Sequence, residues 1–188
     1  MGNTVYDFKS CDKLGRIGEA VAESYFNSLD TVKISYSVRN QKEFQAKDID
    51  LIVEREDSNT YSVEVKTDSY ISGNMFYETY SDVMEKKLGC LEISEADYLF
   101  YYFINPSFRS AYIFDIKELR NWVNEHKVEY KPKRVLNKGF ISEGYALPLE
   151  RLVADLKSID VIDLNCLENI EWFEEQGRSY WDKKKKSE

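Results

Sequence analysis

The stretch that decides the fold reads Lys47-Asp48-Ile49-Asp50-Leu51-Ile52-Val53 and continues, after a polar turn at Asp57-Ser58-Asn59, as Ser62-Val63-Glu64-Val65-Lys66-Thr67-Asp68. Both apolar runs are rich in the β-branched residues that strands favour. Because only a short polar segment separates them, the runs at 49–53 and 61–65 predict an antiparallel β-hairpin.

One face of the second predicted strand carries both an acid and a base. Glu64 and Lys66 are two residues apart, so their side chains point to the same side of the strand. Asp50 lies beside them if the two strands pair. Two carboxylates next to a lysine are typical surroundings for a hard cation such as Mg²⁺. The lysine ammonium can orient an attacking water and offset charge on a phosphate.

Periodic patterns on either side of the hairpin predict the rest of the domain. Apolar residues recur at helical spacing from Cys11 to Leu29, whereas Arg39 to Lys47 is polar and loop-like. Further strands are predicted at 32–38, 75–80, 98–104, 111–114 and 140–147, and further helices at 115–125, 149–156 and 164–175. This order predicts a mixed α/β domain whose central sheet carries helices.

The spacing of the acidic residues is similar to a known nuclease pattern. Asp50, thirteen residues and then Glu64-Val65-Lys66 resemble the Asp…Glu-x-Lys signature of the PD-(D/E)XK nuclease superfamily. Gly15-Arg16-Ile17-Gly18-Glu19 strengthens the resemblance, because archaeal Holliday-junction resolvases and many phage-encoded nucleases of this superfamily carry a helical glutamate in such a context. The resemblance covers about residues 11–105. It implies a restriction-endonuclease-like fold, in which helices flank a central mixed β-sheet.

The resemblance implies a role for each matching residue. The catalytic set would be Asp50, Glu64, Lys66 and Glu19. Mg²⁺, for which Mn²⁺ substitutes, would be held by Asp50, Glu64, the Val65 carbonyl and Glu19, and Lys66 would position the attacking water. The implied activity is metal-dependent hydrolysis of DNA, by an endonuclease acting in phage or mobile-element recombination, repair or processing. One site per chain calls for two copies to cut both strands, so a homodimer is expected.

Two departures from the family pattern leave residue roles open. Lys47-Asp48 occupies the place of the family's Pro-Asp pair, so Asp48 competes with Asp50 as principal metal ligand. We prefer Asp50, because an aspartate followed by Leu-Ile-Val matches the resolvase-like members. After Lys66 the chain reads as loop and strand rather than helix. This resembles phage-type members with an Asn-x-x-x-Glu stretch, which Asn74 and Glu78 match.

Each candidate also has a purely structural interpretation. Glu64 and Lys66 would then form an ion pair on an exposed sheet face, and Glu19 would be a solvated helix residue. Two alternatives exist for the whole chain. One is a non-catalytic protein that keeps the fold and binds nucleic acid or a protein partner, and the other is a nuclease directed at RNA. Cation binding separates the enzyme from the scaffold, because a scaffold needs no Mg²⁺.

The composition is that of a folded domain. The chain has 188 residues, of which 43% are hydrophobic, and a chain of this length can bury a sizeable core. The three cysteines are odd in number and far apart, which argues against a disulfide framework or zinc ribbon. The single histidine, His126, excludes a multi-histidine metal site. The sequence shows no secretory signal and no run of about 18 apolar residues, so we expect a cytoplasmic protein with no membrane partner.

The net charge of −8 opposes DNA binding, but the charge is segregated. Residues 117–138 carry seven Lys or Arg against three Glu, whereas residues 143–175 carry nine acids against two bases. The expected nucleic-acid contacts are Lys131, Lys133, Arg134 and Lys138, and the alternative for this segment is a solvated loop. We expect one nuclease-like domain over 1–175 and a basic, disordered C-terminal tail over 176–188.

Overall fold

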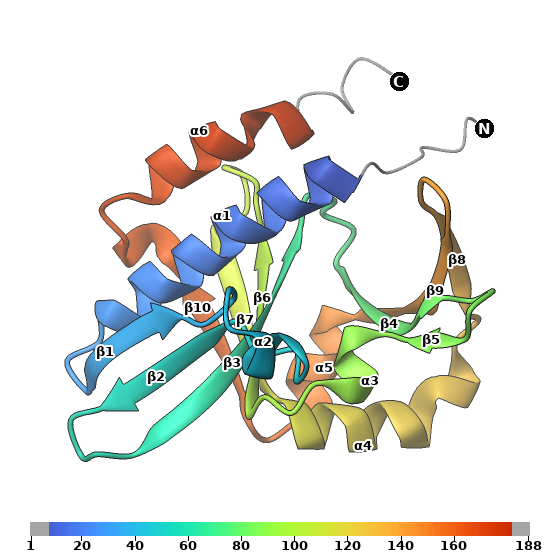
Figure 1. The fold of residues 1–188 in the computed structure, drawn as a ribbon, viewed down its shortest axis with the longest axis horizontal. Coiled ribbons are helices and arrows are strands. Elements are labelled where there is room, and N and C mark those ends of the chain that lie inside the picture. The colour runs from blue at the N-terminus through green and yellow to red at the C-terminus, as the bar shows by residue number, and fades with distance from the viewer. Residues whose placement is uncertain (1–7, 182–188) are drawn as a thin grey trace.

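The computed structural model describes residues 8–181 and places a six-stranded sheet at the centre (Figure 1). In spatial order this sheet contains β1 (Val32–Ser37), β2 (Leu51–Arg55), β3 (Thr60–Asp68), β6 (Tyr98–Phe103), β7 (Ser110–Asp115) and β10 (Ile159–Asp163). β3 and β6 pair in parallel, and the other neighbouring strands pair antiparallel. The predicted mixed α/β class and its mixed central sheet with flanking helices are confirmed.

Helices cover both faces of the central sheet (Figure 1). α1 (Phe8–Asn27) and α6 (Ile170–Trp181) pack on one face, and α4 (Ile116–His126) and α5 (Leu149–Asp155) contribute to the core on the other. The sheet therefore separates two buried clusters. β6 contributes to both of them, because Leu99 faces the α4 side and Phe100 faces the α1 side. Burial on two faces explains the unbroken apolar run of this strand.

A second sheet packs beside the first on the α4 side. Its antiparallel strands, in spatial order, are β5 (Lys87–Leu88), β4 (Asn74–Asp82), β9 (Ile141–Pro148) and β8 (Lys133–Leu136). Met75 and Tyr77 of β4 and Leu147 of β9 are buried in the same cluster as α4. The short helix α3 (Cys90–Ile93) leads from β5 back to β6. This arrangement brings β4 close to the end of β3, where the candidate site lies.

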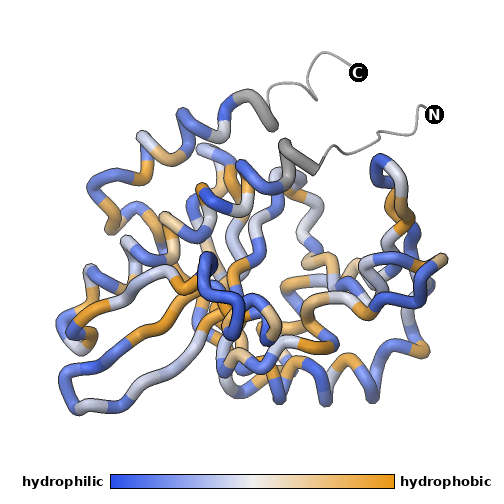
Figure 2. Tube along the Cα trace, in the orientation of Figure 1, coloured by the Kyte–Doolittle hydropathy of each residue, from blue (hydrophilic) through white to orange (hydrophobic). Residues whose placement is uncertain are grey.

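Helix α4 begins where the sequence predicts. The Asp115 carboxylate accepts a hydrogen bond from the Glu118 N–H at 2.9 Å, so it caps the first turn. Leu119, Trp122 and Val123 are buried on one side of the helix. Figure 2 shows the resulting alternation of hydrophobic and hydrophilic positions along α4.

The differences from the sequence expectations concern mainly short elements. The strands β5, β8 and β10 and the one-turn helix α2 (Lys42–Gln45) lie in segments with no predicted strand or helix. The helix predicted at 164–175 is wrong in its first part. A 3₁₀ turn at Leu164–Cys166 precedes α6, because Asp163 accepts from the Asn165 N–H at 3.0 Å and caps the turn. Another 3₁₀ turn, Lys127–Glu129, follows α4.

The C-terminal boundary also differs. The tail expected from residue 176 begins inside α6, which continues to Trp181, and residues 182–188 lie outside the described residues. No helix within residues 8–181 is long and apolar enough to cross a membrane.

Candidate active site

Asp50 lies where β2 separates from β3. Its N–H donates to the Val63 carbonyl at 3.0 Å. Leu51 and Val63 are the last pair of residues that the two strands share at this end. Two residues further along β3, the Val65 N–H donates to Oδ2 of Asp50 at 2.9 Å. The side chain thus satisfies a backbone donor that β2 no longer reaches. This hydrogen bond fixes the Asp50 carboxylate against β3.

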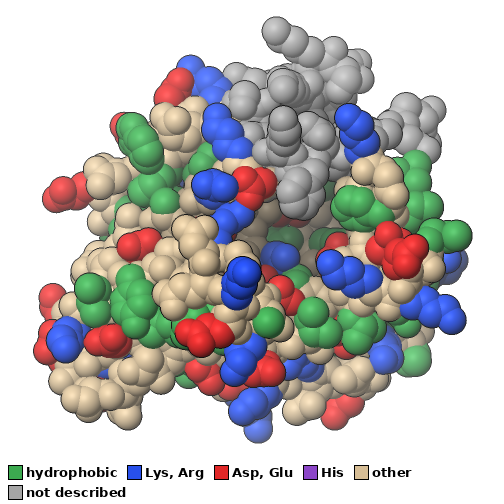
Figure 3. Space-filling view, viewed as in Figure 1, with side chains coloured by type: hydrophobic (Ala, Val, Ile, Leu, Met, Phe, Trp, Pro, Cys, Tyr) green, Lys and Arg blue, Asp and Glu red, His purple; other side chains and the backbone are tan. Residues whose placement is uncertain are grey.

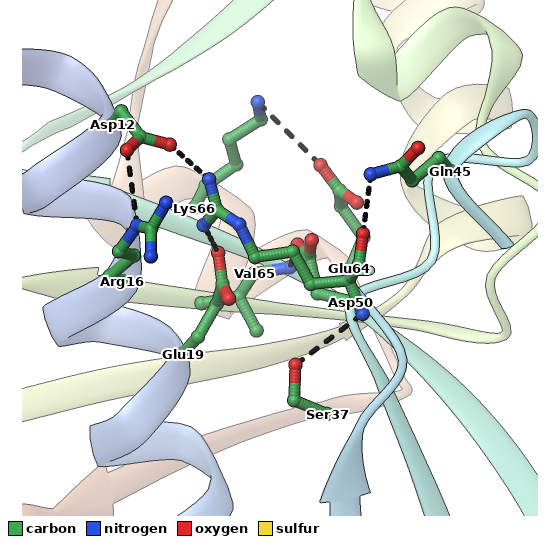
Figure 4. Close-up of polar contacts among 10 residues, drawn as sticks. Asp12, Arg16, Glu19, Ser37, Gln45, Asp50, Glu64, Val65 and Lys66 are labelled. Atoms are coloured by element: carbon green, nitrogen blue, oxygen red, sulfur yellow. Dashed lines mark hydrogen bonds and ion pairs between the residues drawn. The ribbon is translucent and has the colours of Figure 1, made fainter. Parts of the chain in front are cut away.

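Asp50, Glu64 and Lys66 lie together, as the hairpin predicts (Figure 4). Glu64 is 4% exposed, and its Oε1 lies 3.6 Å from Nζ of Lys66. Burial raises the pKa of the Glu64 carboxyl well above its ordinary value; Lys66 opposes this shift, and Asp50 and Asp48 add to it. Glu64 is therefore buried rather than on an exposed sheet face, and its ion pair joins it to a partly exposed Lys66.

Lys66 is held among acidic and sulfur groups. Burial alone would lower the pKa of Lys66, but Cys90, Glu64 and Glu78 favour the charged form more strongly, and the pKa is raised well above its ordinary value. Burial raises the pKa of the Cys90 thiol to about 12, so the thiol is neutral at pH 7. The Lys66 ammonium therefore interacts with Cys90 as well as with the two carboxylates, and it favours the ionised form of Cys90 in return.

The Lys66 side chain reaches a small pocket between β3 and β4. This pocket has a volume of about 150 Å³ and is lined by Lys66, Thr67, Asp68, Phe76, Glu78, Cys90, Leu91 and Tyr101. The Lys66 side chain is 38% exposed, so its ammonium is accessible to a molecule in this pocket. Cys90 escaped the sequence reasoning because only the pairing of β4 with β5 brings it to Lys66.

Glu19 approaches the site from α1. It is 8% exposed, and burial together with the charge of Asp50 raises its pKa, whereas Arg39 lowers it. Asp50 therefore interacts with both Glu19 and Glu64, and it is their common neighbour. The interpretation of Glu19 as a solvated helix residue is wrong.

Arg39 is the functional candidate that the sequence reasoning missed. Its guanidinium donates to the carboxylates of both Glu19 and Asp12, and Asp12 also accepts from Arg16 at 3.1 Å. Figure 4 shows the two acids and Arg16 along the same side of α1. The segment after β1 reads as a polar loop, and its only signal is an arginine directly after the strand predicted at 32–38.

Asp48 and Glu78 also border the site. Asp48 adopts a left-handed backbone (φ 48°), and burial raises its pKa, with Lys66 opposing and Asp50 adding to the shift. The Glu78 side chain hydrogen-bonds to Ser142 and is close enough to Lys66 to interact electrostatically. Asp48 is therefore close enough to Asp50 and Lys66 to interact with them, and Asp50 is the aspartate that is hydrogen-bonded to β3.

Asn74, the other residue of the phage-type stretch, lies away from the acids. Its side-chain amide donates to the carbonyl and hydroxyl oxygens of Ser72, at 3.0 and 3.2 Å, within the loop between β3 and β4. Asn74 therefore shapes a turn.

The expected nucleic-acid contacts lie on the second sheet. Lys131, Lys133, Arg134 and Lys138 are all exposed, on β8 and its flanking loops. Arg134 pairs with Glu143 of β9 at 2.8 Å. Figure 3 shows basic and acidic side chains intermixed over one face of the molecule. The segment that reads as a solvated loop is thus partly an edge strand with an exposed basic surface.

Several carboxylates lie around Asp50 and Lys66. Six carboxylates (Asp12, Glu19, Asp48, Asp50, Glu64 and Glu78) are linked to four basic groups (Arg16, Arg39, Lys66 and Lys87) by contacts or electrostatic interactions. Carboxylate oxygens with room for retained water are what Mg²⁺ prefers.

In the described part of the chain, no three His, Cys, Asp or Glu side chains already converge on one point as a metal site. Two contacts explain the spread of the carboxylates: Glu19 is drawn to Arg39, and Asp50 is bonded to the Val65 N–H. Metal binding stays a prediction.

Comparison with models of known protein families finds no match, and comparison with curated proteins finds no similar sequence.

Proposed function

We propose that this protein is a magnesium-dependent nuclease with a restriction-endonuclease-like fold, and that it hydrolyses phosphodiester bonds in DNA. The observation that carries the proposal is Asp50, held by the backbone of β3 between Glu19 and Glu64, with the Lys66 ammonium 3.6 Å from Glu64. Buried acids whose pKa is raised by a neighbouring carboxylate, next to a lysine, are a feature of functional sites.

Mg²⁺ would be held by Asp50, Glu64, the Val65 carbonyl and Glu19, and when bound it would supply Lewis-acid activation of water and phosphate. The neighbouring Cys90, Glu64 and Glu78 raise the pKa of Lys66, which favours its ammonium form. This ammonium donates hydrogen bonds that orient the attacking water and offset charge on the phosphate. Glu64 and Glu78 keep this ammonium at the mouth of the pocket.

DNA is the proposed substrate, and the exposed basic residues of β8 are its proposed backbone contacts. An endonuclease with one site per chain would cut both strands as a homodimer. Phage or mobile-element recombination, repair or processing, in the cytoplasm, is the setting in which such an enzyme would act.

A non-catalytic DNA- or protein-binding role is the second candidate. Two observations favour it: the net charge is −8, and Glu19 already has a cationic partner in Arg39. A scaffold of this kind would keep the fold without needing Mg²⁺ or Mn²⁺.

The test is cleavage of linear duplex, single-stranded and four-way-junction DNA, and of single-stranded RNA, with Mg²⁺ and with Mn²⁺. Lys66→Ala and Asp50→Asn are compared with the wild type, and Asp57→Asn, on the exposed β2–β3 turn, is the matched control. We expect metal-dependent cleavage that the first two substitutions abolish and the control retains, with unchanged circular dichroism. No cleavage of any substrate would favour the binding scaffold, and cleavage that survives both site substitutions would overturn the assignment of this site.

A further inference from the structure

Arg39 makes the most extensive charged contact on the α1 side of the site. Its two terminal nitrogens donate to Oε1 of Glu19 and to Oδ1 of Asp12. These acids are seven residues apart on α1, so they lie on the same face of the helix, two turns from one another. The Arg39 side chain is 26% exposed and that of Glu19 is 11% exposed, so the pair is largely shielded from water.

The backbone of Arg39 is held separately from its side chain. Its carbonyl accepts from Nε2 of Gln45 at 2.6 Å, and its N–H donates to Oγ of Ser37 at 3.4 Å. The main chain therefore stays in place if the guanidinium leaves α1. The long side chain of an arginine can reach another position without any change of fold.

Two charged neighbours of Glu19, Arg39 and Asp50, have opposite effects on the stability of its carboxylate charge. The guanidinium of Arg39 stabilises the negative charge of Glu19, whereas the carboxylate of Asp50 destabilises it. A buried carboxylate must be paired with a cation, and it is costly to leave unpaired. In the absence of a metal, Arg39 supplies that cation. If a divalent cation bound between Asp50 and Glu19, the guanidinium and the metal would repel one another at close range.

We propose that Arg39 is a positioning residue that holds Glu19 until a divalent cation binds. Arg39 and the cation compete for the same carboxylate, so loading of the site releases the guanidinium from Glu19. This inference rests on the proposed function, because it takes Glu19 as a metal ligand. In the structure, Glu19 is bonded to Arg39.

The test is Mn²⁺ affinity without DNA, measured by titration calorimetry and by the electron paramagnetic resonance signal of free Mn²⁺. We expect Arg39→Ala to bind Mn²⁺ about fivefold more tightly than the wild type, which corresponds to about 1 kcal/mol. Arg16→Ala is the matched control. It removes the same charge from the neighbourhood of Glu19, but Arg16 bonds to Asp12 and not to Glu19. We expect its Mn²⁺ affinity to stay within about twofold of the wild type.

A double-mutant cycle separates competition for Glu19 from a general effect of charge. Glu19→Gln is expected to weaken Mn²⁺ binding, and in that background Arg39→Ala should change the affinity by less than about twofold. Equal tightening in both backgrounds, or no tightening in the single variant, would overturn the inference. If Arg39→Ala loses its cooperative thermal transition, Arg39→Lys takes its place, because lysine keeps the charge but cannot bond to Asp12 and Glu19 at once.

The wild-type protein provides a second measurement. Side-chain Nε–Hε resonances of arginine are followed by NMR during titration with Mg²⁺, and the Arg39 signal is identified by its loss in Arg39→Lys. A large shift and narrowing of that signal is expected on loading, and an unchanged signal at saturation contradicts release. If the wild type binds neither cation, the proposed function itself fails. If it binds Mn²⁺ through Glu19 and Asp50 with no effect of Arg39, only this inference fails.

Discussion

Gly18 of α1 and Thr67 of β3 are in such close contact that a Cβ atom at Gly18 would lie 1.7 Å from Oγ1 of Thr67. Thr67 directly follows Lys66, and Glu19 directly follows Gly18. The missing side chain therefore lets the helix approach the strand and brings Glu19 toward Asp50. Close packing of α1 against β3 therefore explains why the second glycine of the Gly-x-x-Gly-Glu motif, Gly18, has no side chain.

Gly18→Ala is expected to lower the free energy of unfolding by ~1–3 kcal/mol, because the helix must move away from β3 to relieve the overlap. The matched control is Gly15→Ala in the same helix, where the nearest atom to the added Cβ is Oε1 of Glu19 at 3.9 Å. That substitution should stabilise the protein by up to ~1 kcal/mol through helix propensity. Urea unfolding of both variants provides the measurement, and a change of the same sign in both would contradict the packing role of Gly18.

Asp50→Asn and Asp50→Ala are expected to distinguish the contribution of Asp50 to stability from its contribution to metal binding. The asparagine carbonyl can still accept the Val65 N–H, so stability should stay within ~0.5 kcal/mol of the wild type while Mn²⁺ binding is lost. Asp50→Ala leaves that buried donor without its partner and should cost a further ~1–3 kcal/mol. Chemical denaturation and Mn²⁺ titration are measured side by side. Equal stability of the two variants would show that the hydrogen bond to Val65 is unimportant.

The attachment of α6 is expected to depend on Glu174 and not on Glu171. Arg109 donates to both carboxylate oxygens of Glu174, at 2.8 and 2.9 Å, and the Glu174 side chain is 6% exposed. Glu174→Ala should destabilise the fold by ~2–3 kcal/mol, somewhat less than for a fully buried pair because Arg109 retains some contact with water. Glu171→Ala is the control, since its side chain is 82% exposed and 3.6 Å from Arg109. Its unfolding midpoint should hardly change, and similar losses in both variants would argue against a specific two-point pair.

Acid is expected to weaken the connection between α4 and β10 through Glu118. The Glu118 carboxylate accepts the N–H groups of Lys157 and Ser158, at 2.9 and 2.8 Å, and these hydrogen bonds lower its pKa. A carboxyl with a lowered folded-state pKa contributes stability above its unfolded pKa, and this contribution is lost as the pH falls through the folded value. Glu118→Gln should therefore be less stable than the wild type at pH 7, and the difference should shrink between about pH 5 and pH 3.

Urea midpoints at pH 7, 5, 4 and 3 test this linkage, with Glu125→Gln of the same helix as the control. A stability difference that stays constant over this range would show that the Glu118 charge does not contribute.

Local periodicity explains what the sequence could predict. Alternation along β3 places Glu64 and Lys66 on one side, and the short β2–β3 turn brings Asp50 next to them, so three members of the site follow from neighbours in the chain. The strands β8 and β10 escaped prediction because they have only four and five residues, and β10 also depends on a partner far away in the sequence. β10 pairs with β7, some fifty residues earlier.

The sequence by itself determined the α/β class, the hairpin and the spacing of Asp50, Glu64 and Lys66, because each depends on the two-residue repeat of a strand or on one tight turn. Only the tertiary structure decided which groups surround that set. Arg39 reaches Glu19 across twenty residues, and Cys90 reaches Lys66 across twenty-four. Such contacts follow from how α1, β3 and β4 pack together, and no local pattern of residues encodes them.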